Sequence, residues 1–242
     1  MEILVNGDDF GKNENVTKAI AHCFKKGILS STTLMTNMPY ADEAVEIARK
    51  EGFFHKVGIH LNLTEGFPLT KEIQGSSLFC NQNGEFHGNF HRSTKYRLFM
   101  GRREREMAAL ELAAQLQKYK EYGLSMGHLD SHHHIHTNKP ILDVMIPLLE
   151  KYHIRSMRIS RNLTKDLSFP HKVYKSYYNR RLKKLPISTC DYFGGIRDFK
   201  EYSFLVRDGE KIEIMIHPMY GENKGLFDTD LPMEEVEGIL NI

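Results

Sequence analysis

The chain has 242 residues, with 33 lysine and arginine residues against 31 aspartate and glutamate residues, a formal net charge of +2. This near balance argues against a nucleic-acid-binding or other polyanion-binding protein, and no apolar run approaches the ~18–20 residues that a membrane span requires. The three cysteines are far apart and form no CxxC pair, and the N-terminus has no secretory signal pattern. We therefore expect a cytoplasmic protein.

Short apolar segments alternate with segments of helical periodicity. Strands are predicted at 2–6, 31–38, 56–64, 125–133, 154–160 and 210–218, and helices at 13–27, 40–52, 94–123, 140–152 and 173–184. This alternation predicts a parallel sheet with helices outside it, either doubly wound or closed into a barrel. Because no linker or internal repeat is visible, we expect one domain over residues 1–242.

Between residues 65 and 90 this periodicity is lost, and glycine, asparagine, proline and serine become frequent. A long connection of this kind in a compact domain is typical of a lid or a substrate loop. We therefore expect an insertion loop there.

Polar residues of a metal-binding or acid–base type fall at four predicted strand ends. Asp8 and Asp9 follow the first strand, His60 lies late in the third, the segment "GHLDSHHHIH" ends the fourth, and His217 ends the strand at 210–218. The carboxyl ends of parallel strands lie at one rim, where active sites of such folds occur. A shared site at this rim is therefore predicted.

The histidine-rich segment predicts a metal site. If the strand continues, period-two alternation places His128, Asp130, His132 and His134 on one face. A single metal ion usually takes three protein ligands and keeps one position open, so some of these residues would only surround the site.

The aspartate pair and an arginine each allow two interpretations. Asp8 and Asp9 would point to opposite sides of a strand, but where the chain turns both can reach one water, one as metal ligand and the other as base. Alternatively, "NGDDFGKNEN" is simply a turn. Arg158, late in the fifth strand, either reaches a substrate or is an ordinary surface arginine.

Five segments, "ILVNGDDFG", "STTLMTN", "VGIHLNLTEGFPL", "GHLDSHHHIH" and "EIMIHP", together resemble the YdjC-like carbohydrate deacetylases, including those of the chitooligosaccharide deacetylase type, over about residues 2–220. The resemblance implies a TIM-barrel-like (β/α) barrel related to the NodB-type polysaccharide deacetylases. Family members continue past the "HP" motif to a closing strand, whereas here an acidic segment at 232–240 supplies one short helix. We therefore expect a barrel that is incompletely closed at the C-terminus.

The resemblance also implies roles for individual residues. Asp9, His60 and His132 would hold a divalent metal, Asp8 would be the general base, and His217 would be the general acid that protonates the departing amine. By resemblance the metal is magnesium, although a ligand set of two histidines and one aspartate suits zinc or another transition metal better. Candidates for substrate binding are His128, Asp130, His136 and Arg158.

The implied activity is metal-dependent removal of an N-acetyl group from an amino sugar or chitooligosaccharide, such as diacetylchitobiose, with release of acetate. The alternatives are another metallohydrolase on the same rim, such as a phosphoesterase or cyclic amidase, and a non-catalytic metal- or sugar-binding module. Phosphoesterases and cyclic amidases more often use two metal ions. A binding module would have no use for an additional acid and base beside the metal ligands. The expected partner is a small carbohydrate, with no nucleic acid or membrane, and any assembly is expected to be a homodimer.

Overall fold

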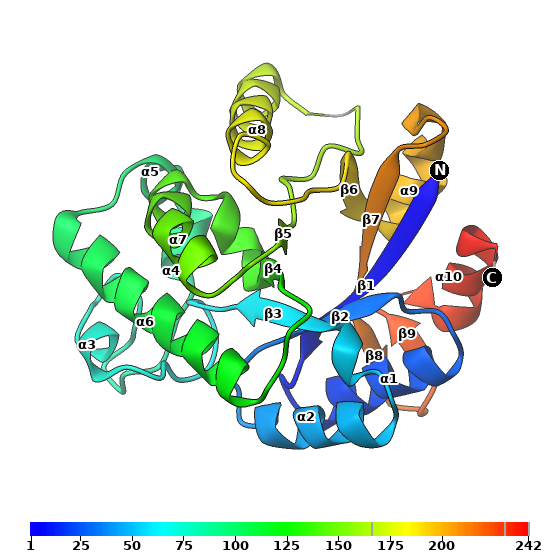
Figure 1. The fold of residues 1–242 in the computed structure, drawn as a ribbon, viewed down its shortest axis with the longest axis horizontal. Helices are drawn as coiled ribbons and strands as arrows, with labels where there is room; N and C mark the ends of the chain where they lie inside the picture. The colour runs from blue at the N-terminus through cyan, green and yellow to red at the C-terminus, as the bar shows by residue number, and fades with distance from the viewer. Residues whose placement is uncertain (166, 230, 242) are drawn as a thin grey trace.

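A curled parallel sheet forms the centre of the computed structural model, which describes residues 1–165, 167–229 and 231–241 (Figure 1). In chain order its strands are β1 (Glu2–Phe10), β2 (Ser31–Leu34), β3 (Val57–Leu61), β4 (His128–Ser131), β5 (Ser156–Met157), β6 (Tyr192–Gly195) and β7 (Lys211–Ile216). They are joined in the order β5-β4-β3-β2-β1-β7-β6, with parallel neighbours throughout. The predicted α/β fold with a barrel-like sheet is confirmed.

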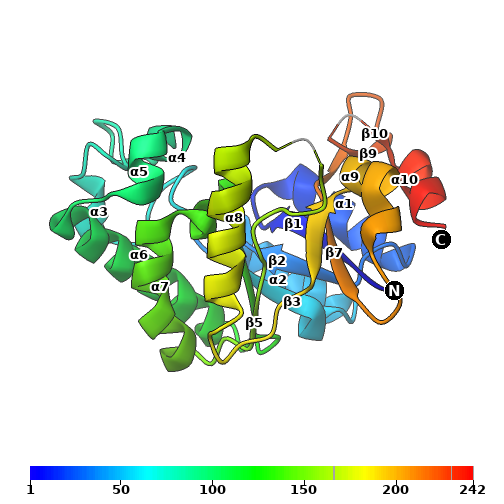
Figure 2. The ribbon, with the colours of Figure 1, turned by 90° about the horizontal axis from the view of Figure 1, so that it is seen from above.

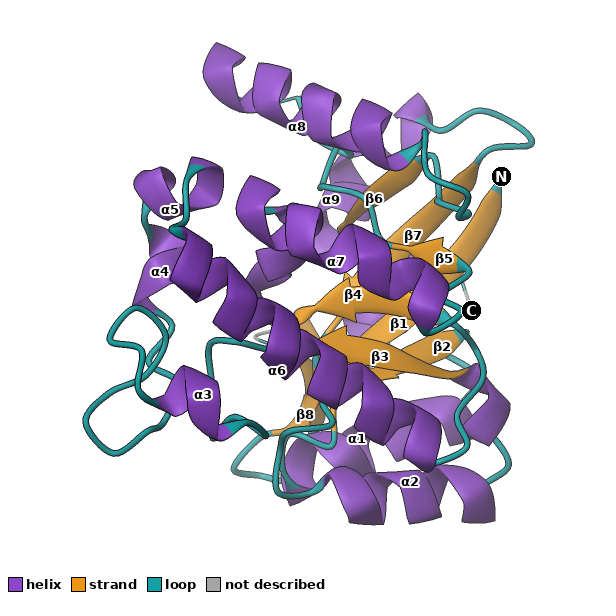
Figure 3. Ribbon diagram, turned by 60° about the vertical axis from the view of Figure 1, so that its left-hand side comes forward, coloured by secondary structure: helices purple, strands orange, loops and turns teal. Residues whose placement is uncertain are grey.

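Helices surround the sheet, as Figure 3 shows. The longer ones are α1 (Glu14–Lys25), α2 (Ala41–Lys50), α6 (Arg102–Glu121), α7 (Lys139–Lys151), α8 (Phe169–Leu182) and α9 (Ile196–Tyr202). Shorter pieces are α3 (Lys71–Gln74), α4 (Asn89–Arg92), α5 (Thr94–Leu98) and the 3₁₀ turns η1 (Phe54–Lys56), η2 (His132–Thr137) and η3 (Ser203–Leu205). Within the described part of the chain, no helix has both the length and the apolar character needed to cross a bilayer.

The first strand–helix unit illustrates how sequence produces this packing. The side-chain oxygen of Asn13 accepts a hydrogen bond from the Val16 backbone N–H at 3.0 Å and so caps α1. One face of α1, including Val16, Ala19, Ile20 and Cys23, is buried. Burial of such an apolar stripe against the sheet, rather than helix propensity alone, stabilises a helix of this length.

The sheet is not closed between its two edge strands, β5 and β6, and we call this junction the seam. One isolated bridge, Ser156 to Ser188, and hydrogen bonds from the backbone N–H groups of Asn162 and Leu163 to the Phe193 carbonyl at 3.1 Å cross this seam. The expectation of an incompletely closed barrel is confirmed, and the opening lies in the middle of the chain rather than at its end.

The C-terminal segment builds a separate antiparallel sheet instead of a closing strand. Its members are β8 (Pro218–Tyr220), β9 (Leu226–Asp228) and β10 (Leu231–Pro232), followed by the predicted short helix, α10 (Met233–Leu240). These elements lie on one side of the fold, and α4 to α7 lie on the other (Figure 2).

Two predicted elements differ from the structure, and one strand was not predicted. The helix predicted at 94–123 is split into α5 and α6, because Phe99 and Gly101 have extended backbone angles. The strand predicted at 154–160 is only two residues long, and β6 was not predicted. Its sequence, "YFGG", contains two glycines, which weaken a strand signal.

The insertion at 65–90 is anchored rather than free. It contains α3 and a bridge between Cys80 and Phe86, and its side chains Ile73, Phe79 and Phe90 are buried. Such burial argues against a loose lid, because opening would expose these apolar groups.

The tight pairing of β3 with its neighbours gives a first prediction. A Cβ atom on Gly58 would lie 2.8 Å from the His128 carbonyl oxygen and 3.0 Å from Thr33 Cγ2, whereas Gly75 has no atom within 4 Å of such a position. Gly58→Ala should therefore destabilise the fold by about 1–3 kcal/mol, and Gly75→Ala should not. Urea unfolding of both variants measures this, and equal stabilities would show that the strands yield freely.

Candidate functional site

Three predicted metal ligands converge at the carboxyl-end rim of the sheet. Asp9 comes from β1, His60 from β3 and His132 from the residue after β4, and their ligand atoms lie within 4.8 Å of one another. Asp9 Oδ1 is 3.2 Å from His60 Nε2 and 2.8 Å from His132 Nδ1. All three are buried.

Adjacent carboxylates reach this rim because β1 is irregular there. The pairing of β1 with β2 changes register between Gly7 and Phe10, and Asp9 has a φ of 70°. Such bulges redirect side chains, and aspartate tolerates left-handed backbone better than most residues. Asp8 and Asp9 therefore both line the site, although they are neighbours in a strand.

Each histidine has a carboxylate on its other ring nitrogen. His60 Nδ1 lies 2.6 Å from Asp130 Oδ1, and His132 Nε2 lies 2.9 Å from Glu65 Oε2. Carboxylates in this position orient metal-binding imidazoles and increase their basicity. Lys12 joins the same group, 2.8 Å from Glu65 and 3.6 Å from Asp9.

Arg158 is completely buried and contacts three carboxylates. Its Nη1 and Nη2 donate to the two oxygens of Asp8 at 2.7 Å, Nη2 also lies 2.7 Å from Asp130 Oδ2, and Nε donates to Glu213 Oε1 at 2.6 Å. The guanidinium carbon is 4.7 Å from the centroid of the Phe193 ring. Arg158 is therefore neither a surface residue nor free to reach a substrate.

These contacts determine the ionisation of the carboxylates. Burial alone would raise the pKa of Asp8, but the charge and hydrogen bonds of Arg158 outweigh it and lower that pKa below its usual value. Burial would also raise the pKa of Glu213, but the charges and hydrogen bonds of Arg158 and His128 outweigh it and lower that pKa to about 2. Both groups are ionised at neutral pH.

The imidazoles compensate the remaining negative charge. Burial would lower the pKa of His60, yet the charge and hydrogen bond of Asp130, together with Asp9, raise it to about 10. The pKa of His132 is also raised, because hydrogen bonds to Asp9 and Glu65 outweigh its burial. The cluster thus attracts positive charge, and a divalent cation that displaces these protons fits this donor set.

The four candidates for substrate binding lie behind the site. Asp130, His136 and Arg158 are 0% exposed. His128 Nδ1 lies 3.0 Å from Ser156 Oγ, and His136 Nδ1 lies 2.5 Å from Ser131 Oγ. Because these three side chains have no accessible surface, direct contact between them and a sugar does not fit the structure. Asp130 and Arg158 instead support His60 and Asp8.

The strand does not continue through the histidines as the alternation assumed. β4 ends at Ser131, and His133 and His134 have φ values of 51° and 53°. His134 therefore leaves the face shared by His128 and Asp130. Burial and then Arg158 lower its pKa to about 3, so it is neutral.

His217 follows β7 and is half-buried at the same rim. Its backbone N–H donates to Asp228 Oδ1 at 2.7 Å, and its charge contributes to the lowered pKa of Asp8 and of His134. The structure thus brings the residues expected to act as base and acid into one electrostatic group.

Glu65, Glu213 and Lys12 were missed by the sequence analysis. Glu213 could have been noticed, because it lies between Ile212 and Ile214 in a predicted strand. In the structure all three are buried in β7, an internal strand of the seven-stranded sheet. Glu65 lies in the insertion beyond the end of β3, where nothing in the pattern separates it from an ordinary loop residue.

Comparisons with known proteins agree with this geometry. The family described as YdjC-like protein matches residues 2–237. A carbohydrate deacetylase from Geobacillus stearothermophilus is 33% identical over 222 residues, covering 90% of this chain and 79% of the relative. Another from Halalkalibacterium halodurans is 35% identical over 224 residues, covering 91% and 86%.

The fold has a counterpart among solved structures. A candidate cellobiose-phosphate cleavage protein from Enterococcus faecalis matches with a TM-score of 0.71 and 25% identity, covering 99% of this chain and 89% of that one. The sequence matches, together with the architecture that carries the cluster, show that the chain belongs to the YdjC-like family.

Proposed function

We propose that the protein is a metal-dependent deacetylase that hydrolyses the N-acetyl group of an amino sugar or chitooligosaccharide and releases acetate. One observation carries this proposal: the buried cluster of Asp9, His60 and His132 has a second carboxylate, Asp8, and a further histidine, His217, beside it. Relatives named carbohydrate deacetylases, which match 90% and 91% of the chain, support this class of reaction.

Asp9, His60 and His132 would hold the cation, leaving a position for water or substrate. A bound divalent cation would polarise the acetyl carbonyl and lower the pKa of a water molecule. Two imidazoles and one carboxylate favour zinc or another transition metal, whereas magnesium, which the family resemblance favours, prefers oxygen ligands.

Asp8 is the proposed general base. Its Oδ1 accepts hydrogen bonds from Arg158 and from Asn6 Nδ2, and Oδ2 accepts one from Arg158. Since a carboxylate oxygen has two lone pairs, Oδ2 retains capacity to accept the proton of a water. Its lowered pKa makes Asp8 a weak base, suited only to water that is already acidified.

His217 is the proposed general acid. As the acetyl carbon–nitrogen bond breaks, its imidazolium donates a proton to the nitrogen, so that acetate and the free amine separate. Its charge acts on Asp8 from the end of another strand, β7, at the same rim, which supports a division of labour between an acid and a base.

A single metal ion per chain is expected. The described residues offer two further groups, Asp8–His60–Asp130 and His128–Asp130–Glu213. Both include carboxylates that already contact the Arg158 guanidinium at 2.6–2.7 Å, and that fixed cation would repel a second ion.

Metal removal and replacement test the proposal. Acetate release from N,N′-diacetylchitobiose should vanish on chelation and return with one of zinc, cobalt, manganese or magnesium. Asp8→Asn should still bind one metal per chain but lose about 10²–10⁴-fold in kcat, whereas His132→Ala should lose both metal and turnover.

The matched control is His55→Ala, which removes an exposed histidine just before β3 and should behave as wild type. Full activity in Asp8→Asn would refute the base assignment, and two metals per chain would favour a phosphoesterase-type site.

Metal binding should also release protons. With a pKa of about 10, His60 is protonated at neutral pH in the metal-free protein, and only its neutral form is a ligand. Apparent affinity should therefore rise about tenfold per pH unit for each proton released. Calorimetry in buffers of different ionisation enthalpy measures this release, and a value of zero at pH 7 would contradict the assigned role of His60.

The acid role makes a separate prediction. His217→Gln should lose about 10²–10⁴-fold on N-acetyl sugars but much less on p-nitrophenyl acetate, whose leaving group departs without protonation. Parallel kinetics on both substrates provide the measurement. An equal loss on both would assign His217 to a different role.

A further inference from the structure

Two buried polar side chains of α6 take no part in the proposed chemistry. Glu111 and Gln115 are both 0% exposed, whereas glutamate and glutamine usually face water. They lie one turn apart on the same face of the helix, and Gln115 Nε2 donates to Glu111 Oε1 at 2.8 Å. Because burying such groups costs free energy unless they are hydrogen-bonded, their other partners show which part of the chain they hold in place.

Gln115 holds the chain directly after β3. Its Nε2 also donates to the Asn62 carbonyl oxygen at 2.6 Å, and its Oε1 accepts from the Asn62 backbone N–H at 2.9 Å. The side-chain amide thus binds both backbone groups of one residue, as a neighbouring strand does in a sheet. Asn62 lies two positions after His60, a proposed metal ligand.

Asn62 in turn holds the backbone of Glu65. The Asn62 side chain is buried, its Oδ1 accepts from the Glu65 backbone N–H at 3.2 Å, and its Nδ2 donates to the Glu65 carbonyl oxygen at 2.7 Å. The same Oδ1 accepts from the Thr64 backbone N–H at 2.9 Å, which is the pattern of an Asx turn. Through this one side chain, α6 therefore fixes the position of the Glu65 backbone.

The Glu65 carboxylate ends beside a proposed metal ligand. Its Oε2 lies 2.9 Å from His132 Nε2 and 2.8 Å from Lys12 Nζ, while His132 Nδ1 faces Asp9 Oδ1 at 2.8 Å. The Glu65 side chain is 39% exposed, so it is positioned by these two contacts and by its backbone rather than by close packing. A shift of that backbone would therefore change the orientation of the His132 ring.

Glu111 ties a second point of the same segment to α6. Its Oε1 accepts from the Leu69 backbone N–H at 3.0 Å, and its Oε2 accepts from the Thr70 backbone N–H at 2.8 Å and from the Thr70 hydroxyl at 2.7 Å. The helix thus holds the insertion at Asn62 and again at Leu69 and Thr70, on either side of Glu65.

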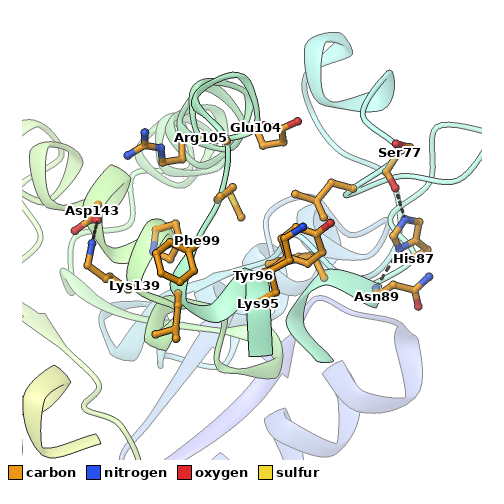
Figure 4. Close-up of a pocket in the computed structure, with 16 residues that line it drawn as sticks. Ser77, His87, Asn89, Lys95, Tyr96, Phe99, Glu104, Arg105, Lys139 and Asp143 are labelled. Carbon is orange, nitrogen blue, oxygen red and sulfur yellow. Dashed lines mark hydrogen bonds and ion pairs between the residues drawn. The ribbon is translucent and has the colours of Figure 1, made fainter. Parts of the chain in front are cut away.

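The remainder of the insertion is held by hydrogen bonds of its own. The Phe86 backbone N–H donates to the Gly66 carbonyl oxygen at 2.8 Å, which pairs the start of the insertion with its end. His87 Nε2 lies 3.1 Å from the Ser77 carbonyl oxygen, and its Nδ1 accepts from the Asn89 backbone N–H at 3.0 Å (Figure 4). Since these contacts do not involve α6, loss of a polar group on α6 should affect the segment next to the metal centre more than the fold of the insertion.

We propose that Gln115 is a positioning residue of the metal centre. Through Asn62 it fixes the backbone of Glu65, and the Glu65 carboxylate holds the His132 imidazole in the orientation that a metal ligand needs. The inference rests on the proposed function, because it takes His132 as a ligand of the metal. Removing a group that orients a metal-binding histidine typically lowers metal affinity by about 10–100-fold. A residue of α6 thus sets the affinity of a site formed by β1, β3 and the chain after β4.

Binding of Co²⁺ to the metal-free protein tests this proposal. Gln115→Ala and Glu65→Gln should each weaken the affinity for Co²⁺ by about 10–100-fold and should change the visible absorption of the bound ion, which reports its ligand geometry. Gln117→Ala is the matched control, since Gln117 is exposed on the same helix and contacts Glu121 at 3.1 Å. It should leave both the affinity and the spectrum unchanged.

A second control separates positioning from a general loss of stability. Tyr119 of α6 is buried, and its hydroxyl donates to the Val57 carbonyl oxygen at 2.8 Å. Tyr119→Phe therefore removes a buried hydrogen bond between α6 and β3 that does not involve Asn62, and it should lower stability in urea without lowering the affinity for Co²⁺. If Gln115→Ala does not fold, Gln115→Met, which preserves most of the side-chain volume, takes its place.

A double-mutant cycle tests the route of the effect. If Gln115 acts through Glu65, the combined variant Glu65→Gln/Gln115→Ala should bind Co²⁺ about as weakly as Glu65→Gln alone. Losses that simply multiply in the combined variant would assign Gln115 a separate effect and overturn the proposal.

The outcomes distinguish this proposal from the proposed function. Weaker Co²⁺ binding by Gln115→Ala, together with no acetate release from any N-acetyl sugar by the metal-loaded wild type, would support the positioning role and refute the deacetylase function. Acetate release by the wild type, with unchanged Co²⁺ affinity and spectrum in Gln115→Ala, would overturn the positioning role and leave the function intact.

Discussion

The buried guanidinium of Arg158 is the contact on which the rest of the site depends. It contacts carboxylates from β1, β4 and β7, and Arg158 itself directly follows β5. One buried side chain therefore links four strands of the sheet. Removing one partner of such a buried pair generally costs 3–5 kcal/mol, because the other charge is left uncompensated. Through Asp8 it holds the proposed base, and through Asp130 it sets the orientation of His60. Stability and chemistry therefore share one electrostatic centre.

A single guanidinium does not balance all the buried negative charge. Asp9 instead has His60, His132 and, at 3.6 Å, Lys12 as partners. A metal bound there would take the place of the protons on His60 and His132, which is why a metal fits this corner and not the space already occupied by Arg158. The arrangement separates two kinds of carboxylate: Asp8 is held ionised by a permanent charge, and Asp9 faces the position where a removable charge can bind.

Much of this arrangement could be predicted, for a topological reason. Parallel strands bring their carboxyl ends together whatever the loops do, so Asp9, His60 and His132 could be grouped from their positions alone, and family resemblance added their roles. Arg158 could not be interpreted in the same way, because nothing in the segment "SMRIS" indicates that its single arginine is buried. Glu65 depends on how the insertion folds back, and the break at Phe99 depends on packing between helices. These are long-range effects, which local periodicity does not report.

The seam between β5 and β6 has a consequence for how such enzymes diversify. Only a few backbone hydrogen bonds cross it, and the stretch that joins its two sides carries α8, while Asp9, His60 and His132 belong to the other part of the sheet. Beyond Arg158, a segment placed in this way can change in length without altering the spacing of the ligand atoms, since surface connections tolerate such changes far better than paired strands. The incomplete barrel thus leaves the chain between Arg158 and β6 less constrained by backbone pairing than the strands that carry the ligand atoms.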